Sequence, residues 1–160
     1  AAIRAGVLTV MVNSGELNGE AVHASRRILH DLLRVQLGFN GVVVTDWEDI
    51  IKLHTVHRVA ETELDAIELA LRAGIDMSMV PQDWEFPVLL KELVEEGAIS
   101  EARIDLSVRR ILTLKERLGL LEEGGEALPA MLTEKERLAL EVAPAQAARK
   151  CITLLKNEND

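Results

Sequence analysis

The chain carries, at residues 41–47, the run Gly-Val-Val-Val-Thr-Asp-Trp. An unbroken series of β-branched residues is typical of a strand that is covered on both faces, as in a parallel sheet. Two further short runs, residues 7–12 and 75–80, indicate strands of the same kind. Ligands of parallel α/β proteins bind at the carboxyl ends of the strands, so Asp46 and Trp47 stand where chemistry is expected.

Segments with helical spacing lie between and after these strands. Apolar residues recur at helical intervals over residues 28–37, 64–71, 86–94 and 104–118, followed by Gly38, Gly74, Gly97 and Gly119 respectively. Glycine readily adopts the left-handed conformation that ends a helix, so the four glycines predict helix ends. The βα alternation predicts a parallel sheet with right-handed crossovers. A small open sheet and the last portion of an eight-stranded barrel both fit this pattern.

The sequence changes character after Gly119. Residues 121–132 are interrupted by glycine and proline and predict a linker. A helix is expected to begin after Thr133, and Pro144 either interrupts or restarts it. Residues 151–155 predict the beginning of a strand, which suggests that a second domain starts here.

Composition narrows the class of protein. The chain has 160 residues, of which 48% are hydrophobic and 28% charged, as expected for one globular domain of common size. No apolar run approaches the roughly 20 residues that a membrane-spanning helix needs. The net charge of −9 argues against a nucleic-acid partner. The run at residues 5–12 is short for a signal peptide and is better interpreted as a buried strand, and the compartment stays open.

Asp46 is the first candidate for a catalytic residue. A carboxylate beside an indole suits a sugar site, because the acid can act at the anomeric carbon while the ring of Trp47 covers a sugar face. The alternative is that Asp46 caps the following turn and Trp47 only packs. Ser14 and Ser25 lack the His and Asp context of a nucleophilic serine.

Metal and nucleotide sites are not predicted. His54 and His57 lie three positions apart, but nearby acidic residues do not complete a recognised metal-ligand spacing. Glycine-rich phosphate-binding motifs are absent from the sequence, and no cofactor is expected. Met11, Met77 and Met79 lie in the predicted strands, where methionine usually fills the core.

Taken together, the motifs closely resemble those of glycoside hydrolase family 3. The resemblance rests on Val10-Met11-Val12, Asn18-Gly19, His23-Ala24-Ser25, Leu37 to Trp47, Ala73 to Pro81, Ile104-Asp105, Val108 to Leu112, Leu118 to Leu120, Ala147 to Lys150 and Thr153 to Asn157. It covers essentially the whole chain.

The resemblance implies a fold class and a division into domains. It implies an α/β chain that forms part of a (β/α)8 TIM-like barrel, with about three βα units. Residues 1–119 would be the C-terminal part of that barrel and residues 120–143 an interdomain linker. Residues 144–160 would start a second domain, an α/β sandwich.

The resemblance also implies a retaining β-glycoside hydrolase that acts on terminal β-linked glucose or related sugars without a cofactor. Asp46 matches the nucleophile of the family, and Trp47, Met11 and Met79 match residues that line the sugar pocket. A Glu beyond this chain would be the general acid/base, so little turnover is expected of the chain alone. Many relatives carry an aromatic residue in the loop that here reads Asn-Ser-Gly-Glu-Leu, residues 13–17, which puts an aromatic contact at the pocket edge in doubt.

A second hypothesis belongs to another class of function. A partial barrel leaves strand edges unpaired and an apolar inner face open, and both favour self-association. The chain would then be a non-catalytic αβ fragment that forms a homo-oligomer or binds a complementing chain.

Overall fold

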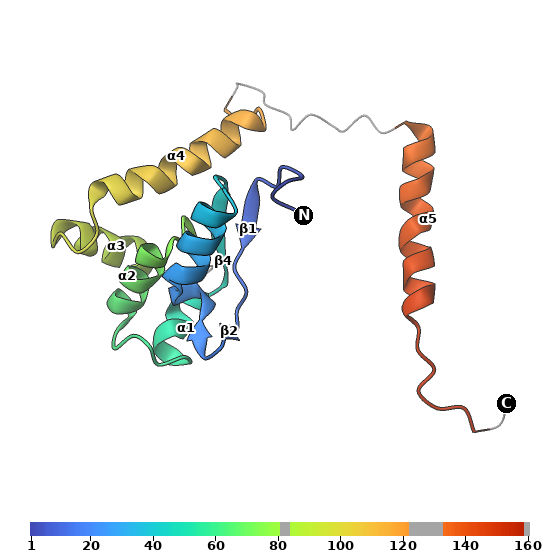
Figure 1. The fold of residues 1–160 in the computed structure, drawn as a ribbon, viewed down its shortest axis with the longest axis horizontal. Helices are drawn as coiled ribbons and strands as arrows, with labels where there is room; N and C mark the ends of the chain where they lie inside the picture. The colour runs from blue at the N-terminus through green and yellow to red at the C-terminus, as the bar shows by residue number, and fades with distance from the viewer. Residues whose placement is uncertain (81–83, 122–132, 159–160) are drawn as a thin grey trace.

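A computed structural model describes residues 1–80, 84–121 and 133–158 (Figure 1). In chain order its elements are β1 (Thr9–Met11), β2 (Glu16–Leu17), β3 (Glu20–Ala21), η1 (Val22–Ala24), η2 (Arg27–Gln36), β4 (Val42–Trp47), α1 (Asp49–Thr55), α2 (Glu63–Ala73), β5 (Met77–Met79), α3 (Glu85–Glu95), α4 (Glu101–Arg117) and α5 (Glu134–Cys151). The predicted mixture of parallel strands and crossover helices is therefore confirmed. The predicted division at residues 119 and 143 stays a prediction, and most of the expected linker lies outside the described residues.

Three parallel strands form the central sheet in the order β1-β4-β5. Val10 on β1 pairs with Val43 on β4, and Val44 on β4 pairs with Met77 on β5. Gly41 lets β1 and β4 approach each other, because a Cβ atom there would lie 2.1 Å from the Leu8 carbonyl oxygen. Helices cover one face of the sheet, where Val43 is fully buried.

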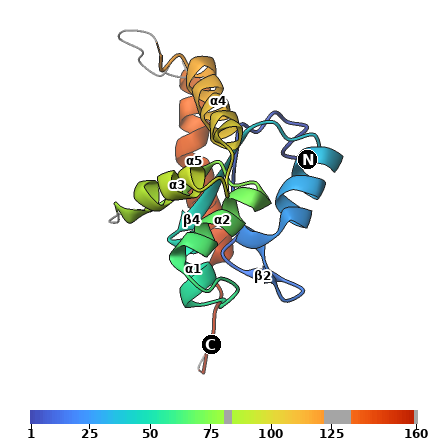
Figure 2. The same ribbon diagram turned by 90° about the vertical axis from the view of Figure 1, so that its left-hand side faces the viewer.

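The helices end where the sequence predicts. Gly38, Gly74, Gly97 and Gly119 all have positive φ angles, between 69° and 127°. Thr62 begins α2 with a capping box, in which its hydroxyl accepts a hydrogen bond from the Asp65 amide while the Asp65 carboxylate accepts one from the Thr62 amide. In both views α4 lies at the end of the molecule opposite α1 and the β2–β3 hairpin (Figures 1 and 2).

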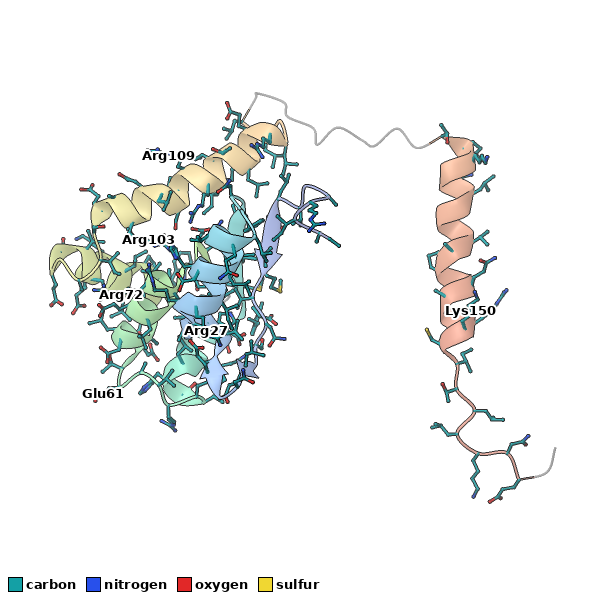
Figure 3. The ribbon with its side chains drawn as sticks, in the orientation of Figure 1. Arg27, Glu61, Arg72, Arg103, Arg109 and Lys150 are labelled. Atoms are coloured by element: carbon teal, nitrogen blue, oxygen red, sulfur yellow. The ribbon has the colours of Figure 1, made fainter. Side chains whose placement is uncertain are left out.

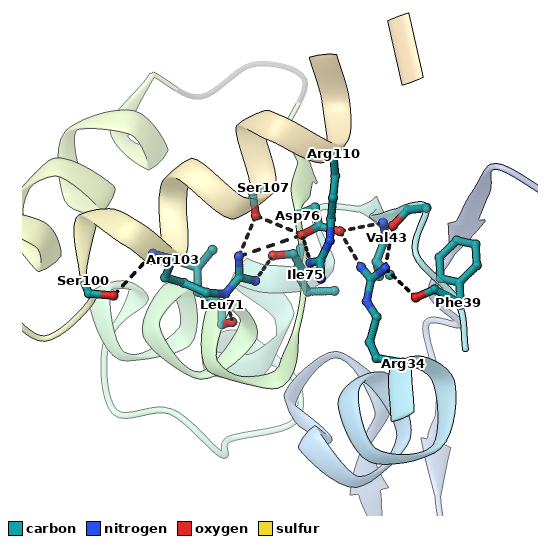
Figure 4. Close-up of polar contacts among 11 residues, drawn as sticks. Arg34, Phe39, Val43, Leu71, Ile75, Asp76, Ser100, Arg103, Ser107 and Arg110 are labelled. Atoms are coloured by element: carbon teal, nitrogen blue, oxygen red, sulfur yellow. Dashed lines mark hydrogen bonds and ion pairs between the residues drawn. The ribbon is translucent and has the colours of Figure 1, made fainter. Parts of the chain in front are cut away.

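A buried carboxylate holds the α4 end together. Asp76, just before β5, accepts hydrogen bonds from Arg34 at 2.6 Å, Arg110 at 2.8 Å, Ser107 at 2.9 Å and the Val43 amide at 3.0 Å (Figure 4). These partners come from η2, α4 and β4. One side chain therefore joins three elements to the start of β5.

Arginines also join α2 to the segments that follow it (Figures 3 and 4). Arg103 on α4 donates to the carbonyl oxygens of Leu71 and Ile75, at 3.0 and 2.6 Å. Arg72 on α2 donates to the Ala98 carbonyl at 2.7 Å. The carbonyls in the last turn of a helix lack partners within the helix, and Arg103 supplies one for Leu71 in α2.

The C-terminal part differs from the sequence prediction. In Figure 1, α5 stands apart from the rest of the described chain. It continues through Pro144 as one helix, so the expected interruption is wrong. An exposed helix tolerates the proline because water can bond the freed carbonyl. The strand expected at residues 151–155 is also wrong: Cys151 ends the helix and residues 152–158 form no strand, since a strand needs a neighbour for its amides and carbonyls.

No helix in the described part of the chain combines the length and apolar character needed to cross a membrane.

Candidate active site

The four predicted site residues lie at the carboxyl ends of adjacent parallel strands. Met11 ends β1, Asp46 and Trp47 end β4, and Met79 ends β5. Because the three strands are parallel neighbours, these ends share one edge of the sheet. The sheet therefore brings together residues that are as far apart as Met11 and Met79 in the sequence.

One face of the sheet is open at this edge. Met11 and Met77 pair with Val44 from either side, and their side chains are 54% and 51% exposed. Asp46 lies two positions after Val44, at the carboxyl end of β4, and its side chain is partly exposed. The expectation that Met11 and Met77 fill the core is wrong among the described residues, because more than half of each is exposed.

A β-bulge lies beside Asp46. Val44 and Trp47 of β4 are three positions apart, but their partners Met77 and Met79 of β5 are only two positions apart. The buried Thr45 hydroxyl accepts a hydrogen bond from the Met79 amide at 2.7 Å and so replaces a ladder bond. Bulges commonly redirect a side chain next to a functional site.

Both carboxylate oxygens of Asp46 accept hydrogen bonds. Oδ1 accepts from the Trp47 amide at 2.7 Å, and Oδ2 accepts from the Ser14 hydroxyl at 2.9 Å. The Trp47 amide bond and then the Ser14 bond lower the pKa of Asp46 below its ordinary value. The carboxylate is therefore ionised at neutral pH, as a nucleophile requires.

The loop after β1 presents Ser14 to Asp46. The Asn13 side-chain oxygen accepts a hydrogen bond from the Gly15 amide at 2.7 Å, which is the bond of an Asx turn. A Cβ atom at Gly15 would lie 2.8 Å from that oxygen, so the tight turn suits glycine. The sequence did not indicate this role for Ser14, since nothing in its local spacing points to a carboxylate on another strand.

Trp47 is half-exposed rather than packed, with 49% of its surface accessible. About half of this residue is therefore accessible to a ligand, and its role in a sugar site stays a prediction. The capping alternative for Asp46 holds in part, because its carboxylate does bond the next amide. Asp46 is not the cap of α1, however: Glu48 precedes that helix with a left-handed φ of 58°.

His54 and His57, which lie three positions apart in the sequence, bind different partners. The His54 ring bonds the Ala60 carbonyl oxygen at 3.2 Å, and the His57 ring bonds the Glu16 carboxylate at 2.9 Å. Within the described residues, no group of three or more His, Cys, Asp and Glu side chains is placed to hold a metal ion.

A buried histidine that the sequence prediction missed lies under the site. His23, on η1, accepts a hydrogen bond at Nε2 from the Asp46 amide at 3.4 Å. The same nitrogen lies 3.6 Å from the Asp49 carboxylate. Burial is the main cause that lowers the pKa of His23. The motif that contains His23 supported the resemblance, but its spacing gave no sign of this contact.

Comparison with known proteins decides the family. Residues 1–114 match the family model described as "Glycosyl hydrolase family 3 N terminal domain". The chain belongs to this family. The resemblance found in the sequence is thereby confirmed.

Other members of glycosyl hydrolase family 3 match most of the chain. The lysosomal beta glucosidase of Dictyostelium discoideum is 47% identical over 157 residues, which are 98% of this chain and 19% of that protein. A β-glucosidase structure from Erythrobacter marinus has a TM-score of 0.76 at 31% identity and covers 99% of this chain and 21% of its own. A β-glucosidase from Listeria innocua in complex with glucose has a TM-score of 0.75 at 30% identity, over 89% and 20%. The chain therefore spans about one fifth of these family members.

Proposed function

We propose that this chain supplies the nucleophile of a retaining β-glycoside hydrolase, with Asp46 in that role. The observation that carries the proposal is the state of Asp46: an ionised carboxylate with two hydrogen-bond donors, at the end of a parallel strand on an open face. In this reaction an Asp46 oxygen attacks the anomeric carbon while the leaving oxygen takes a proton from a general acid. Water then hydrolyses the covalent glycosyl-enzyme and releases the sugar with its configuration retained.

Trp47, Met11 and Met79 are proposed to line the pocket of the terminal sugar. Trp47 and Met11 are exposed, apolar and at the same sheet edge as Asp46, which suits contact with a sugar face. Met79 is half-buried, and its carbonyl oxygen accepts a hydrogen bond from the Glu48 amide at 3.0 Å. It therefore holds the residue that directly follows Trp47.

The proposed substrate is a terminal β-linked glucose. Several relatives are named β-glucosidases, and Listeria innocua structures were obtained with glucose and with laminaribiose. The general acid/base is proposed to be a Glu outside this chain. Asp49 is unsuited to that role, because it is 2% exposed and ion-paired with Lys52.

The test is the intact mass of the chain after incubation with a 2-deoxy-2-fluoro-β-glucoside that has a good leaving group. Such a reagent needs little acid assistance, so the nucleophile is examined separately from the general acid. We expect a mass increase that peptide analysis locates on Asp46 and that Asp46→Asn abolishes. Glu48→Gln, which changes an exposed carboxylate two positions away, should label like the wild type. A folded chain that gains no adduct would contradict the proposal.

A second candidate is self-association through the open sheet, which the exposed Met11 and Met77 favour. It needs no chemistry at Asp46, and its measurement is the oligomeric state.

A further inference from the structure

A buried polar cluster lies directly beneath Asp46 and has no part in the chemistry proposed above. His23 and Asp49 are 3% and 2% exposed, whereas Asp46 is partly exposed. Buried ionisable groups are costly unless neighbouring groups compensate them. His23 contacts the backbone of Asp46, and Asp49 lies beside His23.

The cluster holds two peptide groups close to Asp46, the Thr45–Asp46 group and the Trp47–Glu48 group. His23 Nε2 accepts the hydrogen bond of the Asp46 amide, and Lys52 Nζ donates to the Trp47 carbonyl oxygen at 2.8 Å. Lys52 in turn donates to Asp49 Oδ1 at 2.6 Å. One cluster thus fixes the peptide group directly before Asp46 and the peptide group directly after Trp47.

The backbone that follows Trp47 has a conformation that must be stabilised by its surroundings. Glu48, the residue after Trp47, has a φ of 58°, a left-handed conformation that costs free energy in residues other than glycine. Strain of this kind persists where the surroundings over-determine the conformation. The hydrogen bonds to the Asp46 amide and the Trp47 carbonyl help to fix the backbone in this conformation.

His23 Nε2 has two neighbours with opposite demands. The Asp46 N–H needs an acceptor, while Asp49 Oδ2, 3.6 Å away, is buried without a hydrogen-bond partner. One ring nitrogen can accept or donate, but it cannot do both. Neutral His23 with its proton on Nδ1 accepts from Asp46, whereas protonated His23 would present a proton to Asp49 and lose the Asp46 bond.

The charges around His23 favour the neutral ring. Asp49 on α1 and Asp46 on β4 raise its pKa, while His57 after α1 and Lys52 on α1 lower it. Burial acts more strongly than any of these, so the pKa of His23 lies below the ordinary histidine value. The accepting form therefore prevails at neutral pH.

We propose that neutral His23 is a positioning residue for Asp46: its Nε2 holds the Asp46 amide, and Asp49 with Lys52 holds the Trp47–Glu48 peptide group. The consequence for catalysis rests on the proposed function, since it assumes that Asp46 is the nucleophile. The contact itself does not depend on that assumption.

The first test is a pH titration of the 160-residue chain by ¹⁵N NMR. We expect the neutral His23 ring to carry its proton on Nδ1, and the Asp46 amide resonance to shift with the midpoint of His23. In His23→Gln the Asp46 amide should show no such shift, because glutamine accepts a hydrogen bond without titrating. A ring protonated on Nε2 in its neutral form, or an Asp46 amide that ignores the His23 titration, would overturn the proposal.

The second test is the rate at which the 2-deoxy-2-fluoro-β-glucoside labels Asp46. Misplacement of a reacting group by about 1 Å can slow a reaction about a hundredfold. We expect His23→Ala to slow labelling by about tenfold to a hundredfold, and His23→Gln to recover most of the rate. His54→Gln is the matched control, since His54 bonds the Ala60 carbonyl and should label like the wild type.

The two measurements separate the two proposals. If the wild-type chain is never labelled, the proposed function fails, and the NMR titration still decides whether His23 holds the Asp46 amide. If the wild type and folded His23→Ala are labelled at the same rate, positioning by His23 fails while Asp46 remains the nucleophile.

Discussion

Asp46 combines two properties that usually oppose each other: its charge is stabilised and its oxygens remain accessible. Each oxygen accepts one hydrogen bond, from the Trp47 amide or from the Ser14 hydroxyl. A carboxylate offers about four lone-pair sites, so lone pairs remain for attack. The donors lower the pKa without burying the group, which suits a nucleophile better than a buried ion pair would.

Ser14→Ala is expected to raise the pKa of Asp46 toward its ordinary value, because one of two stabilising donors is removed. Ser14→Thr keeps the hydroxyl and should leave the pKa low. Since folding lowers this pKa, the contribution of Asp46 to stability is present above the ordinary Asp value of about 3.9 and is lost as the pH falls through the lowered pKa. The measurement is a titration of the Asp46 carboxyl carbon by ¹³C NMR, and equal midpoints in Ser14→Ala and the wild type would contradict the expectation.

Whether a site residue could be predicted from the sequence depends on how far apart in the chain the contacting residues lie. Asp46 and Trp47 could be predicted, because a strand end is visible in seven consecutive residues. Ser14 and His23 could not, because their contacts with Asp46 span 32 and 23 positions. Contacts of that length depend on how β1 and η1 pack beside β4, which local spacing does not reveal.

At the scale of elements, Asp76 connects the start of β5 to η2, β4 and α4. Its carboxylate is completely buried and faces Arg34, Arg103 and Arg110 from η2 and α4, with Arg103 at 3.8 Å (Figure 4). Removing the carboxylate would leave three guanidinium groups facing one another without an anion. The network therefore stabilises the fold at the end of the sheet opposite Asp46.

Asp76→Ala is expected to lower the free energy of unfolding by about 3–5 kcal/mol, the usual result of breaking a buried ion pair from one side. Asp105→Ala is the control, because Asp105 is an exposed carboxylate on α4 and its loss should change stability by less than about 0.5 kcal/mol. Urea unfolding followed by circular dichroism measures both. Similar losses for the two variants would show that the Asp76 network contributes no special stability.

At the scale of elements, periodicity predicted the main helices and strands, since their apolar faces are buried together. It missed the β2–β3 hairpin, whose strands have two residues each. Asn18 and Gly19 carry its turn with φ angles of 55° and 79°, and an Asn-Gly pair is a recognised signal for such a turn. The strand predicted at residues 151–155 was wrong because apolar composition alone does not supply a pairing partner.

In the described residues the central sheet has one face covered by helices, and the other face is open at the carboxyl ends of the strands, around Met11 and Met77. Within the described residues β1 and β5 are its edge strands, and Met11 and Met77 leave apolar surface on the open face. In solved family members the matching part is about one fifth of a longer chain. With Asp46 as the proposed nucleophile, the open face is where a general acid from outside this chain would act.

This open face predicts that the chain associates with itself, because unpaired strand edges and exposed apolar side chains favour pairing between copies. Light scattering should give a mass above the 17.7 kDa of one chain, increasing with protein concentration. Met77→Lys should reduce association, since a lysine on an edge strand opposes pairing. Val35→Lys adds the same charge at an exposed position on η2 and should not. A monomer at every concentration would reject the second candidate function. Association that Met77→Lys abolishes, in a chain whose Asp46 still takes the sugar label, would show that the open face serves both the sugar and a second chain.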